Sequence, residues 1–171
     1  MKVIGIIPSR YESSRFPGKP LIDLAGKTMI QRVYEGASRS KLMDRVIVAT
    51  DDHRIFNEVS SFGGDVMMTS THHQTGTDRC IEVVNSVDKC DIAINIQGDE
   101  PLVNVDQIDR MVNAFSDSSV QIATLANSNI TKDEVANMNR IKLVLDQNDN
   151  ALYFSRSVIP NTSKGNPEQL Y

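Results

Sequence analysis

Short, uninterrupted apolar runs are the feature of this sequence that most limits its possible folds. The first run, Lys2–Pro8 (KVIGIIP), is apolar on both faces of an extended strand and ends at a proline. Such a run is typical of a parallel strand covered on both sides, because a strand with one face in water alternates apolar and polar residues. The same pattern recurs in four later segments: Arg45–Thr50, Asp65–Met68, Asp91–Ile96 and Gln121–Leu125.

Segments of helical character separate and follow these runs. They are expected at Thr28–Ser38, Arg54–Phe62, Asp78–Val87, Val105–Phe115 and Lys132–Ala136. Phe62-Gly63-Gly64 is typical of a helix end, since glycine readily adopts the left-handed cap conformation, and Thr75 or Thr77 is placed to cap the helix that follows. Strands that alternate with helices of about ten residues predict a doubly wound α/β fold with a mostly parallel sheet, in which ligands bind at the strand ends.

The pattern changes in the last third of the chain. Lys142–Leu145 (KLVL) and Ala151–Phe154 (ALYF) flank the polar turn Asp146–Asn150, and together they predict a β-hairpin. The tail Pro160–Tyr171 is polar. Because 171 residues suffice to bury the core of one domain, a single domain over residues 1–171 is expected.

Charge is distributed unevenly along the chain. The net charge of −4 argues against a protein that binds nucleic acid through broad electrostatic attraction. Residues 1–28 nevertheless carry a net charge of +3, so the remainder carries −7. A positive segment on an acidic protein favours a small anionic ligand over a polyanion.

The cysteines and the apolar runs bear on where the protein works. Cys80 and Cys90 are too few for a secreted disulfide framework, and no segment resembles a signal peptide. The apolar stretch Val3–Ile7 is far too short to span a membrane. We therefore expect a cytoplasmic protein with reduced thiols and no membrane partner.

Three cations follow the first predicted strand: Arg10, Arg15 and Lys19, in the segment SRYESSRFPGKP. A nucleoside triphosphate carries about four negative charges, which must be neutralised before a nucleophile approaches phosphorus. Arginine grips phosphate oxygens in pairs, and a lysine adds a point charge. A basic loop in solvent is the alternative interpretation, but a position directly after a buried strand favours a phosphate site.

A carboxylate follows the fourth predicted strand, in Gln97-Gly98-Asp99-Glu100-Pro101. It is expected at the same sheet edge as the basic loop. Mg²⁺ binds one or two carboxylates together with phosphates and water, and Asp99 suits this role. A helix-capping aspartate is the alternative. Asp51 and Asp52, after the second strand, are interpreted as caps of the next helix.

A second phosphate-binding pattern is only superficial. Gly26-Lys27-Thr28 imitates the end of a P-loop, but that motif requires glycine at position 21, where this chain has Leu21. A turn followed by a helix cap is the better interpretation, and it excludes a P-loop kinase or GTPase.

Two of these segments resemble a known family. IIPSRYESSRFPGKPL is similar to the amino-terminal segment of the 3-deoxy-manno-octulosonate (Kdo) cytidylyltransferases, and NIQGDEP resembles their metal-binding segment. The resemblance implies a nucleotide-diphospho-sugar transferase-like (Rossmann-like) fold. It implies that Arg10, Arg15 and Lys19 bind the triphosphate of CTP, that Asp99 binds Mg²⁺, and that Gln97 contacts the base or the sugar. Arg10, Lys19 and Asp99 are the implied catalytic residues.

A further segment, MTSTHHQTGTDR, resembles the part of the family that lines the nucleobase site. This implies that Gln74, Thr75, Gly76 and Arg79 belong to the nucleotide site. Choosing cytosine over uracil requires acceptors for the cytosine amino group, which backbone carbonyls and a glutamine supply.

ALYFSRSVIP resembles the start of the family's acidic-sugar site, which implies that Arg156 pairs with the Kdo carboxylate. A surface arginine after a hairpin is the alternative. His72, His73 and Cys80 match no usual spacing of zinc ligands, so a polar loop is the better interpretation there.

The resemblance covers essentially all 171 residues. It implies the reaction of CTP with Kdo to give CMP-Kdo and pyrophosphate for lipopolysaccharide biosynthesis, with Mg²⁺ as cofactor and a homodimer in the full-length form. Family members are longer, and their later portion supplies sugar contacts, dimer surface and a second metal-binding aspartate. We therefore expect a nucleotidyltransferase domain shortened on its carboxyl-terminal side, which binds CTP and Mg²⁺ but turns over little.

Two other functions stay open at this point. One is activation of a different 2-keto sugar acid, such as sialate or an amino analogue of Kdo. The other is an inactive nucleotide-binding fragment.

Overall fold

The computed structural model describes residues 1–12, 16–129 and 131–159. The chain forms two compact units, Met1–Thr124 and Leu125–Tyr171. In the described part of the chain, no helix is both long and apolar enough to cross a membrane. Both cysteines are free.

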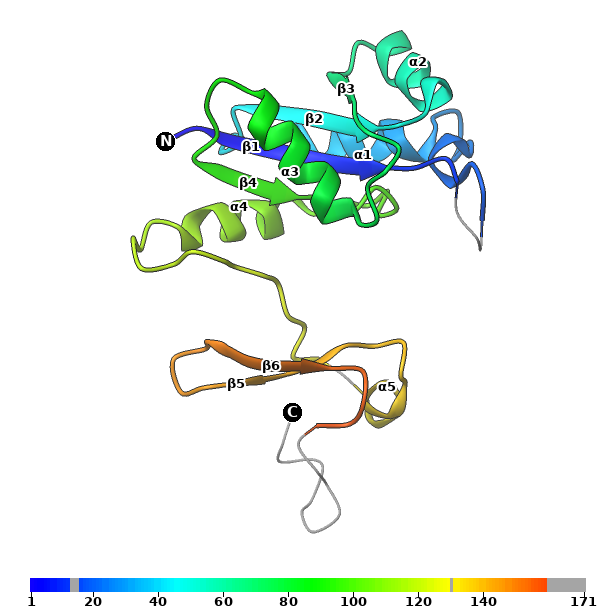
Figure 1. Cartoon of the computed structure of the whole chain (residues 1–171). Helices are drawn as coiled ribbons and strands as arrows, with labels where there is room; N and C mark the ends of the chain where they lie inside the picture. The colour runs from blue at the N-terminus through cyan, green and yellow to red at the C-terminus, as the bar shows by residue number, and fades with distance from the viewer. Residues whose placement is uncertain (13–15, 130, 160–171) are drawn as a thin grey trace. The chain divides into compact units, whose positions relative to one another are not determined.

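The first unit is built on a parallel sheet of four strands in the order β3-β2-β1-β4 (Figure 1). The strands are β1 (Val3–Ser9), β2 (Arg45–Thr50), β3 (Val66–Met68) and β4 (Ile92–Asn95). The two central strands, β1 and β2, are buried along almost their whole length. This burial explains their continuous apolar sequences, since both faces of a central parallel strand are covered.

Helices cover both faces of this sheet, as the apolar runs predict. Residues of α1 (Met29–Ala37), α2 (His53–Ser61) and α4 (Val105–Ala114) share one core with one face of the strands. The opposite face forms a smaller core with α3 (Gly76–Ser86), to which Cys80 and Val83 contribute. The doubly wound α/β fold is therefore confirmed. A short 3₁₀ helix, η1 (Lys19–Leu21), was not expected from the sequence.

Side-chain caps begin the helices at the expected places. Thr28 accepts a hydrogen bond from the backbone N–H of Gln31, so Gly26-Lys27-Thr28 is a turn and a helix cap. Thr75 forms a capping box with Asp78 at the start of α3. Gly63 follows Phe62, the C-cap of α2, and has a φ of 77°, the left-handed conformation that favours glycine.

One predicted strand is absent. Gln121–Leu125 has no regular secondary structure, and no described strand pairs with it. Its apolar residues are largely in solvent, with Ile122 90% exposed. An apolar run becomes a strand only where another strand can share its backbone hydrogen bonds. The prediction of a strand at Gln121–Leu125 is therefore wrong.

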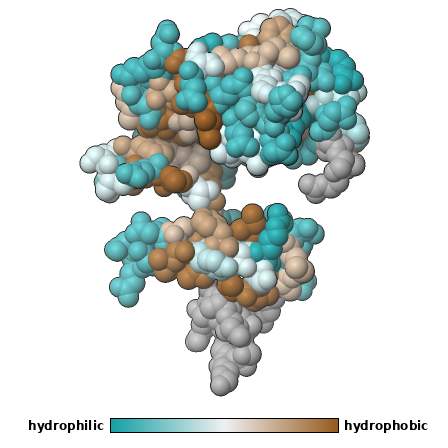
Figure 2. All heavy atoms as spheres, viewed as in Figure 1, coloured by the Kyte–Doolittle hydropathy of each residue, from teal (hydrophilic) through white to brown (hydrophobic). Residues whose placement is uncertain are grey.

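The second unit contains α5 (Lys132–Ala136) and an antiparallel hairpin of β5 (Lys142–Leu145) and β6 (Ala151–Ser155), which confirms the predicted hairpin. Its one buried lysine among the described residues, Lys142, donates to the carbonyls of Asn137, Arg140 and Arg156. On the face shown in Figure 2, apolar side chains gather over this unit. Leu152 and Tyr153 of β6 are more than half exposed. A single domain over residues 1–171 stays a prediction.

Candidate functional site

Four segments meet at the carboxyl edge of the parallel sheet. They are the basic loop after β1, Asp51 after β2, the segment Thr69–Thr75 after β3, and Gln97–Asp99 after β4. Parallel strands place their following loops at one edge, which is where α/β proteins bind ligands. The residues predicted for the nucleotide site in the first unit lie on these segments or on the helix that follows one of them.

The basic loop and the aspartate after β4 are in direct contact. Nζ of Lys19 lies 2.7 Å from Oδ2 of Asp99, and both side chains are partly exposed. On the other side of the loop, the Arg10 guanidinium donates to the carbonyl of His73 at 2.6 Å. One cation of the first loop, Lys19, therefore adjoins the carboxylate after β4, and Arg10 lies against the segment after β3. Arg15 lies outside the described residues.

The loop has a defined backbone shape at its closing end. Gly18 has a φ of 73°, and its N–H donates to the carbonyl of Tyr11 at 2.8 Å. A Cβ at Gly18 would lie 3.2 Å from the Tyr11 ring, so glycine is required both for the φ value and for the close contact. The guanidinium of Arg54 in α2 lies 3.2 Å from the centroid of the same ring. This cation–π contact supports the loop from outside.

Gly98 permits the close approach of the segment that carries Asp99. A Cβ at this position would lie 3.1 Å from the carbonyl oxygen of Pro8, at the end of β1. The backbone of Pro8 is fixed in the sheet, so it yields less readily than a flexible side chain. Glycine between Gln97 and Asp99 thus has a packing reason.

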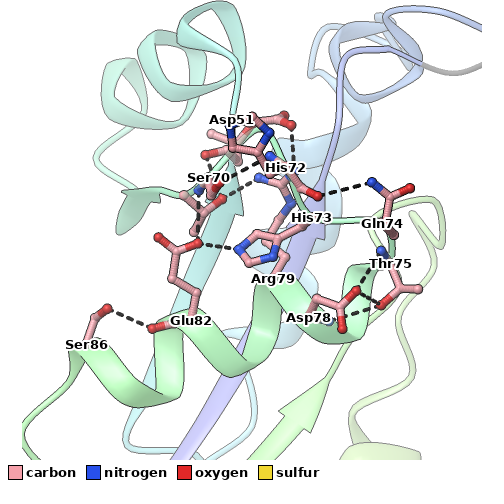
Figure 3. Close-up of polar contacts among 12 residues, drawn as sticks. Asp51, Ser70, His72, His73, Gln74, Thr75, Asp78, Arg79, Glu82 and Ser86 are labelled. Atoms are coloured by element: carbon pink, nitrogen blue, oxygen red, sulfur yellow. Dashed lines mark hydrogen bonds and ion pairs between the residues drawn. The ribbon is translucent and has the colours of Figure 1, made fainter.

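Side chains of α3 hold the segment Thr69–Thr75 (Figure 3). Asp78 accepts from the N–H and the hydroxyl of Thr75, and these bonds hold the pKa of the Asp78 carboxyl below its usual range. Glu82 accepts from the N–H of Ser70 at 2.9 Å and pairs with Nε2 of His73. The Ser70 N–H and the His73 ring lower the pKa of Glu82. The segment is therefore fastened at several points by one helix.

Arg79 contributes a different kind of contact. Its side chain is fully buried, and it pairs with Asp51 at 2.6 Å and donates to the hydroxyl of Thr69. The interpretation of Asp51 as a helix cap is wrong, because Asp52 alone caps α2 and Asp51 faces the buried arginine instead. Direct contact of Arg79 with a nucleotide stays a prediction.

The remaining predicted nucleotide residues lie at the surface of the same edge. Gln74 is exposed and donates to the carbonyl of His72 at 3.2 Å. Gly76 is the first residue of α3, where a Cβ would lie 3.2 Å from the Pro8 ring. Gln97 is exposed, and its side-chain amide reaches Asn95 at 3.4 Å. These positions leave the polar groups open to a ligand, and their roles stay predictions.

Arg156 belongs to the second unit. It is exposed, and its guanidinium donates weakly to the carbonyl of Met138 at 3.3 Å. Its predicted pairing with a sugar carboxylate stays a prediction.

Asp99 fits a metal that arrives with its substrate. Within residues 1–12, 16–129 and 131–159, no three His, Cys, Asp or Glu side chains form a group that could hold a metal ion. A single exposed carboxylate matches the way Mg²⁺ binds, because this ion keeps several waters and takes other oxygens from phosphates. The donor set therefore suits Mg²⁺ bound with a triphosphate better than an ion enclosed by protein.

A parallel sheet covered on both faces, with cations and a carboxylate at its carboxyl edge, defines a doubly wound α/β protein whose candidate ligand site lies at that edge. More particularly, the chain belongs to the cytidylyltransferase family, whose model matches residues 4–170.

Two curated relatives are about 50% identical to the chain over the aligned residues. The 3-deoxy-manno-octulosonate cytidylyltransferase of Parabacteroides distasonis is 51% identical over 165 residues, which cover 94% of this chain and 65% of the relative. The enzyme of the same name from Fusobacterium nucleatum is 49% identical, covering 96% of this chain and 67% of the relative. The chain thus spans about two thirds of the length of these relatives.

One solved structure shows the same relationship, and a second shows the fold. The structure of CMP:2-keto-3-deoxy-manno-octonic acid synthetase complexed with CTP matches with a TM-score of 0.92 and 43% identity, covering 96% of this chain and 68% of that protein. A 4-diphosphocytidyl-2C-methyl-D-erythritol synthase from Anaerococcus prevotii shares the fold, with a TM-score of 0.56 and 18% identity over 89% of this chain and 64% of that one.

Proposed function

We propose that this chain carries the nucleotide site of an enzyme that converts CTP and Kdo to CMP-Kdo and pyrophosphate. The observation that carries the proposal is the contact of Lys19 with Asp99 at 2.7 Å, beside Arg10 on the same sheet edge. Relatives about 50% identical bear the name of this reaction, and the similar structure with a TM-score of 0.92 holds CTP.

In the proposed complex, the triphosphate lies on the basic loop and the cytosine on the segment Thr69–Gly76. Arg10 supports this order, because it belongs to the basic loop and yet reaches the carbonyl of His73 in the second segment. One nucleotide can therefore touch both segments. Exposed Gln74 and Gln97 offer amide groups to the base or to the sugar.

The chemistry is an in-line displacement at the α-phosphorus. The anomeric hydroxyl of Kdo forms the new O–P bond, the bond from the α-phosphorus to the bridging oxygen breaks, and pyrophosphate leaves with that electron pair. The hydroxyl proton passes to solvent. Arg10 and Lys19 neutralise and orient the phosphates, and this positioning carries most of the rate enhancement.

Asp99 would hold Mg²⁺ together with phosphate oxygens. When bound there, the metal would neutralise phosphate charge and lower the pKa of the attacking hydroxyl. Arg156 is proposed to receive the carboxylate of the sugar. The role in lipopolysaccharide biosynthesis, the homodimer and the cytoplasmic location stay predictions of the sequence.

A binding experiment tests the nucleotide site. We expect the 171-residue chain to bind CTP in the presence of Mg²⁺ in a calorimetric titration. Lys19→Met and Asp99→Asn should each weaken binding by about tenfold or more, because each removes a charged contact to the metal triphosphate. Lys41→Met, which removes a surface lysine after α1, is the control and should bind normally.

The sugar is tested by supplying a panel of 2-keto acids with CTP and measuring pyrophosphate. We expect any turnover, however slow, to favour Kdo over sialate and amino-Kdo. A chain that binds no CTP, or binds it equally well without Lys19 and Asp99, would contradict the proposal.

A further inference from the structure

Arg79 is a charged side chain that the proposed chemistry leaves unused. Its guanidinium is fully buried, and Nε has no hydrogen-bond partner among the described residues. Burying an arginine is costly unless its charge is paired. Here the pairing group is Asp51, which is mostly buried and lies 2.6 Å away. The pair has no net charge and is largely buried, so it adds no net positive charge to the proposed phosphate site.

The pair joins three separate parts of the sheet edge (Figure 3). Asp51 directly follows β2, Arg79 belongs to α3, and Thr69 directly follows β3. Arg79 donates to the hydroxyl of Thr69, and that hydroxyl donates to the carbonyl of Thr50 at 3.0 Å. The N–H of Thr69 donates to the same carbonyl at 2.8 Å. The start of the segment Thr69–Thr75 is thereby fixed to the last residue of β2.

Thr69 is the point from which the chain runs to His73, whose carbonyl accepts from Arg10 of the basic loop. The arrangement of the intervening backbone therefore depends on where Thr69 is held. Backbone carbonyls are proposed to recognise the amino group of cytosine, and a backbone carbonyl stays in place whichever side chain its residue carries. The side chains that hold this backbone in position therefore determine the selectivity for the base.

We propose that the buried Asp51–Arg79 ion pair is a positioning device for base selection. It fixes Thr69 so that the backbone of Thr69–Thr75 distinguishes cytosine from uracil. In this proposal Arg79 and Asp51 are positioning residues that act through Thr69, a role that replaces the direct nucleotide contact predicted for Arg79. This inference rests on the proposed function, because it requires the nucleoside to lie on this segment.

The test compares the affinities for CTP and UTP, each with Mg²⁺, by calorimetry. The double variant Arg79→Leu/Asp51→Asn removes both charges, so no unpaired charge is left inside the protein. We expect it to fold, to bind CTP about tenfold more weakly, and to bind UTP nearly unchanged, so that the CTP-to-UTP ratio falls about tenfold. Thr69→Val removes only the linking hydroxyl and should lower the ratio in the same direction.

The matched control is Arg45→Leu/Asp65→Asn. This pair joins the start of β2 to the residue before β3, both of its side chains are partly exposed, and it has no contact with the segment Thr69–Thr75 among the described residues. Its removal should leave the CTP-to-UTP ratio unchanged.

A purely structural role for the buried pair predicts a different result. The affinities for CTP and UTP would then fall by the same factor, or neither affinity would change, and either outcome overturns the inference. Should the double variant fail to fold, the ratio measured with Thr69→Val decides the matter in the same way. Failure of the unaltered chain to bind CTP is a distinct result, which contradicts the proposed function itself.

Discussion

At Gly98, a missing side chain sets the distance between the segment that carries Asp99 and the end of β1. The nearest atom to an added Cβ is the carbonyl oxygen of Pro8 at 3.1 Å, and the next is Cγ2 of Ile7 at 3.5 Å. A methyl group here pushes against sheet backbone, so the mobile partner is the segment after β4. Asp99 would move with that segment and away from its present contact with Lys19.

We therefore expect Gly98→Ala to impair the site more than the fold. Because a displacement of a few tenths of an ångström is felt at a charged contact, affinity for CTP with Mg²⁺ should fall about three- to tenfold. The melting temperature should fall by only a few degrees, roughly the effect of 1 kcal/mol. Calorimetric titration and thermal unfolding measure the two effects.

Gly63→Ala provides the comparison. Gly63 has a φ of 77° and open space around it, so alanine is strained there without touching the site. This variant should lose about 1 kcal/mol of stability and keep normal affinity. If Gly98→Ala behaves like Gly63→Ala in both measurements, the close approach at Gly98 has no functional consequence.

At the scale of elements, α2 supports the basic loop. Arg54, in the first turn of α2, lies over the Tyr11 ring at 3.2 Å and also pairs with Asp52, the cap of the same helix. Asp52 raises the pKa of Arg54, which keeps the guanidinium charged. Tyr11 in turn contacts Gly18, next to Lys19. A helix thus positions a loop through one aromatic ring.

Removal of this support should loosen the proposed phosphate site without unfolding the sheet. Arg54→Met keeps a long side chain but loses the charge, and Tyr11→Leu loses the ring. We expect each to weaken CTP binding about twofold to fivefold and to speed amide hydrogen exchange at Gly18, because a cation–π contact at an exposed site is worth about 0.5–1 kcal/mol.

Tyr11→Phe retains the ring and serves as the conservative variant. It should bind CTP as the unaltered chain does. Equal affinity in Arg54→Met, Tyr11→Leu and Tyr11→Phe would show that the stacked pair does not position the loop.

At the scale of the whole molecule, burial under α3 couples folding to pH through a thiol. Cys80 belongs to the core between α3 and the sheet, where burial raises the pKa of its thiol to about 11 against an ordinary value of 9.0. The neighbouring Arg79 opposes this rise only in part. A raised pKa means that the folded state favours the protonated thiol.

The sign of the pH effect follows from this. Below pH 9 the thiol is protonated in both states and the stability is fully present; as pH rises from 9 toward 11, only the unfolded chain ionises and stability is lost. The stability lost by pH 10 is about 1 kcal/mol. We expect denaturant unfolding to show a steeper loss of stability in this range for the unaltered chain than for Cys80→Ala.

Cys90→Ala is the comparison for this effect. The pKa of Cys90 is also raised by burial, but this thiol is less buried than Cys80. Removal of the Cys90 thiol should change the loss of stability between pH 9 and 11 less than removal of the Cys80 thiol does. If Cys80→Ala leaves the slope between pH 9 and 11 unaltered, the thiol does not contribute to the pH dependence of folding.

Much of the fold was predictable because its signals are local. The hairpin and α5 match their predicted positions to within a residue, and each of the four sheet strands does so as well. Runs of apolar residues and capping side chains determine structure within a few neighbouring positions, so they can be recognised in a sequence. Gln121–Leu125 was mispredicted because its apolar run resembles a strand, whereas strand formation depends on a partner.

The candidate site was predictable only in part. Lys19 and Asp99 were predicted to lie together from the loops that follow β1 and β4, and the topology brings them within 2.7 Å across 80 positions of sequence, while their roles stay predictions. The sequence did not indicate that Arg54 supports the basic loop, since a charged residue in the first turn of a helix is usually solvated. Asp51 was assigned to the wrong task, because two adjacent aspartates before a helix both look like caps.

The sequence by itself determined the alternation of strands and helices, and with it the edge of the sheet where cations and a carboxylate gather. Tertiary structure alone decided that Arg79 is buried against Asp51, 28 positions away, and that Arg54 lies over Tyr11. The physical reason is that periodicity and capping are properties of neighbouring residues, whereas pairing of a buried charge depends on which distant segment the fold brings beside it.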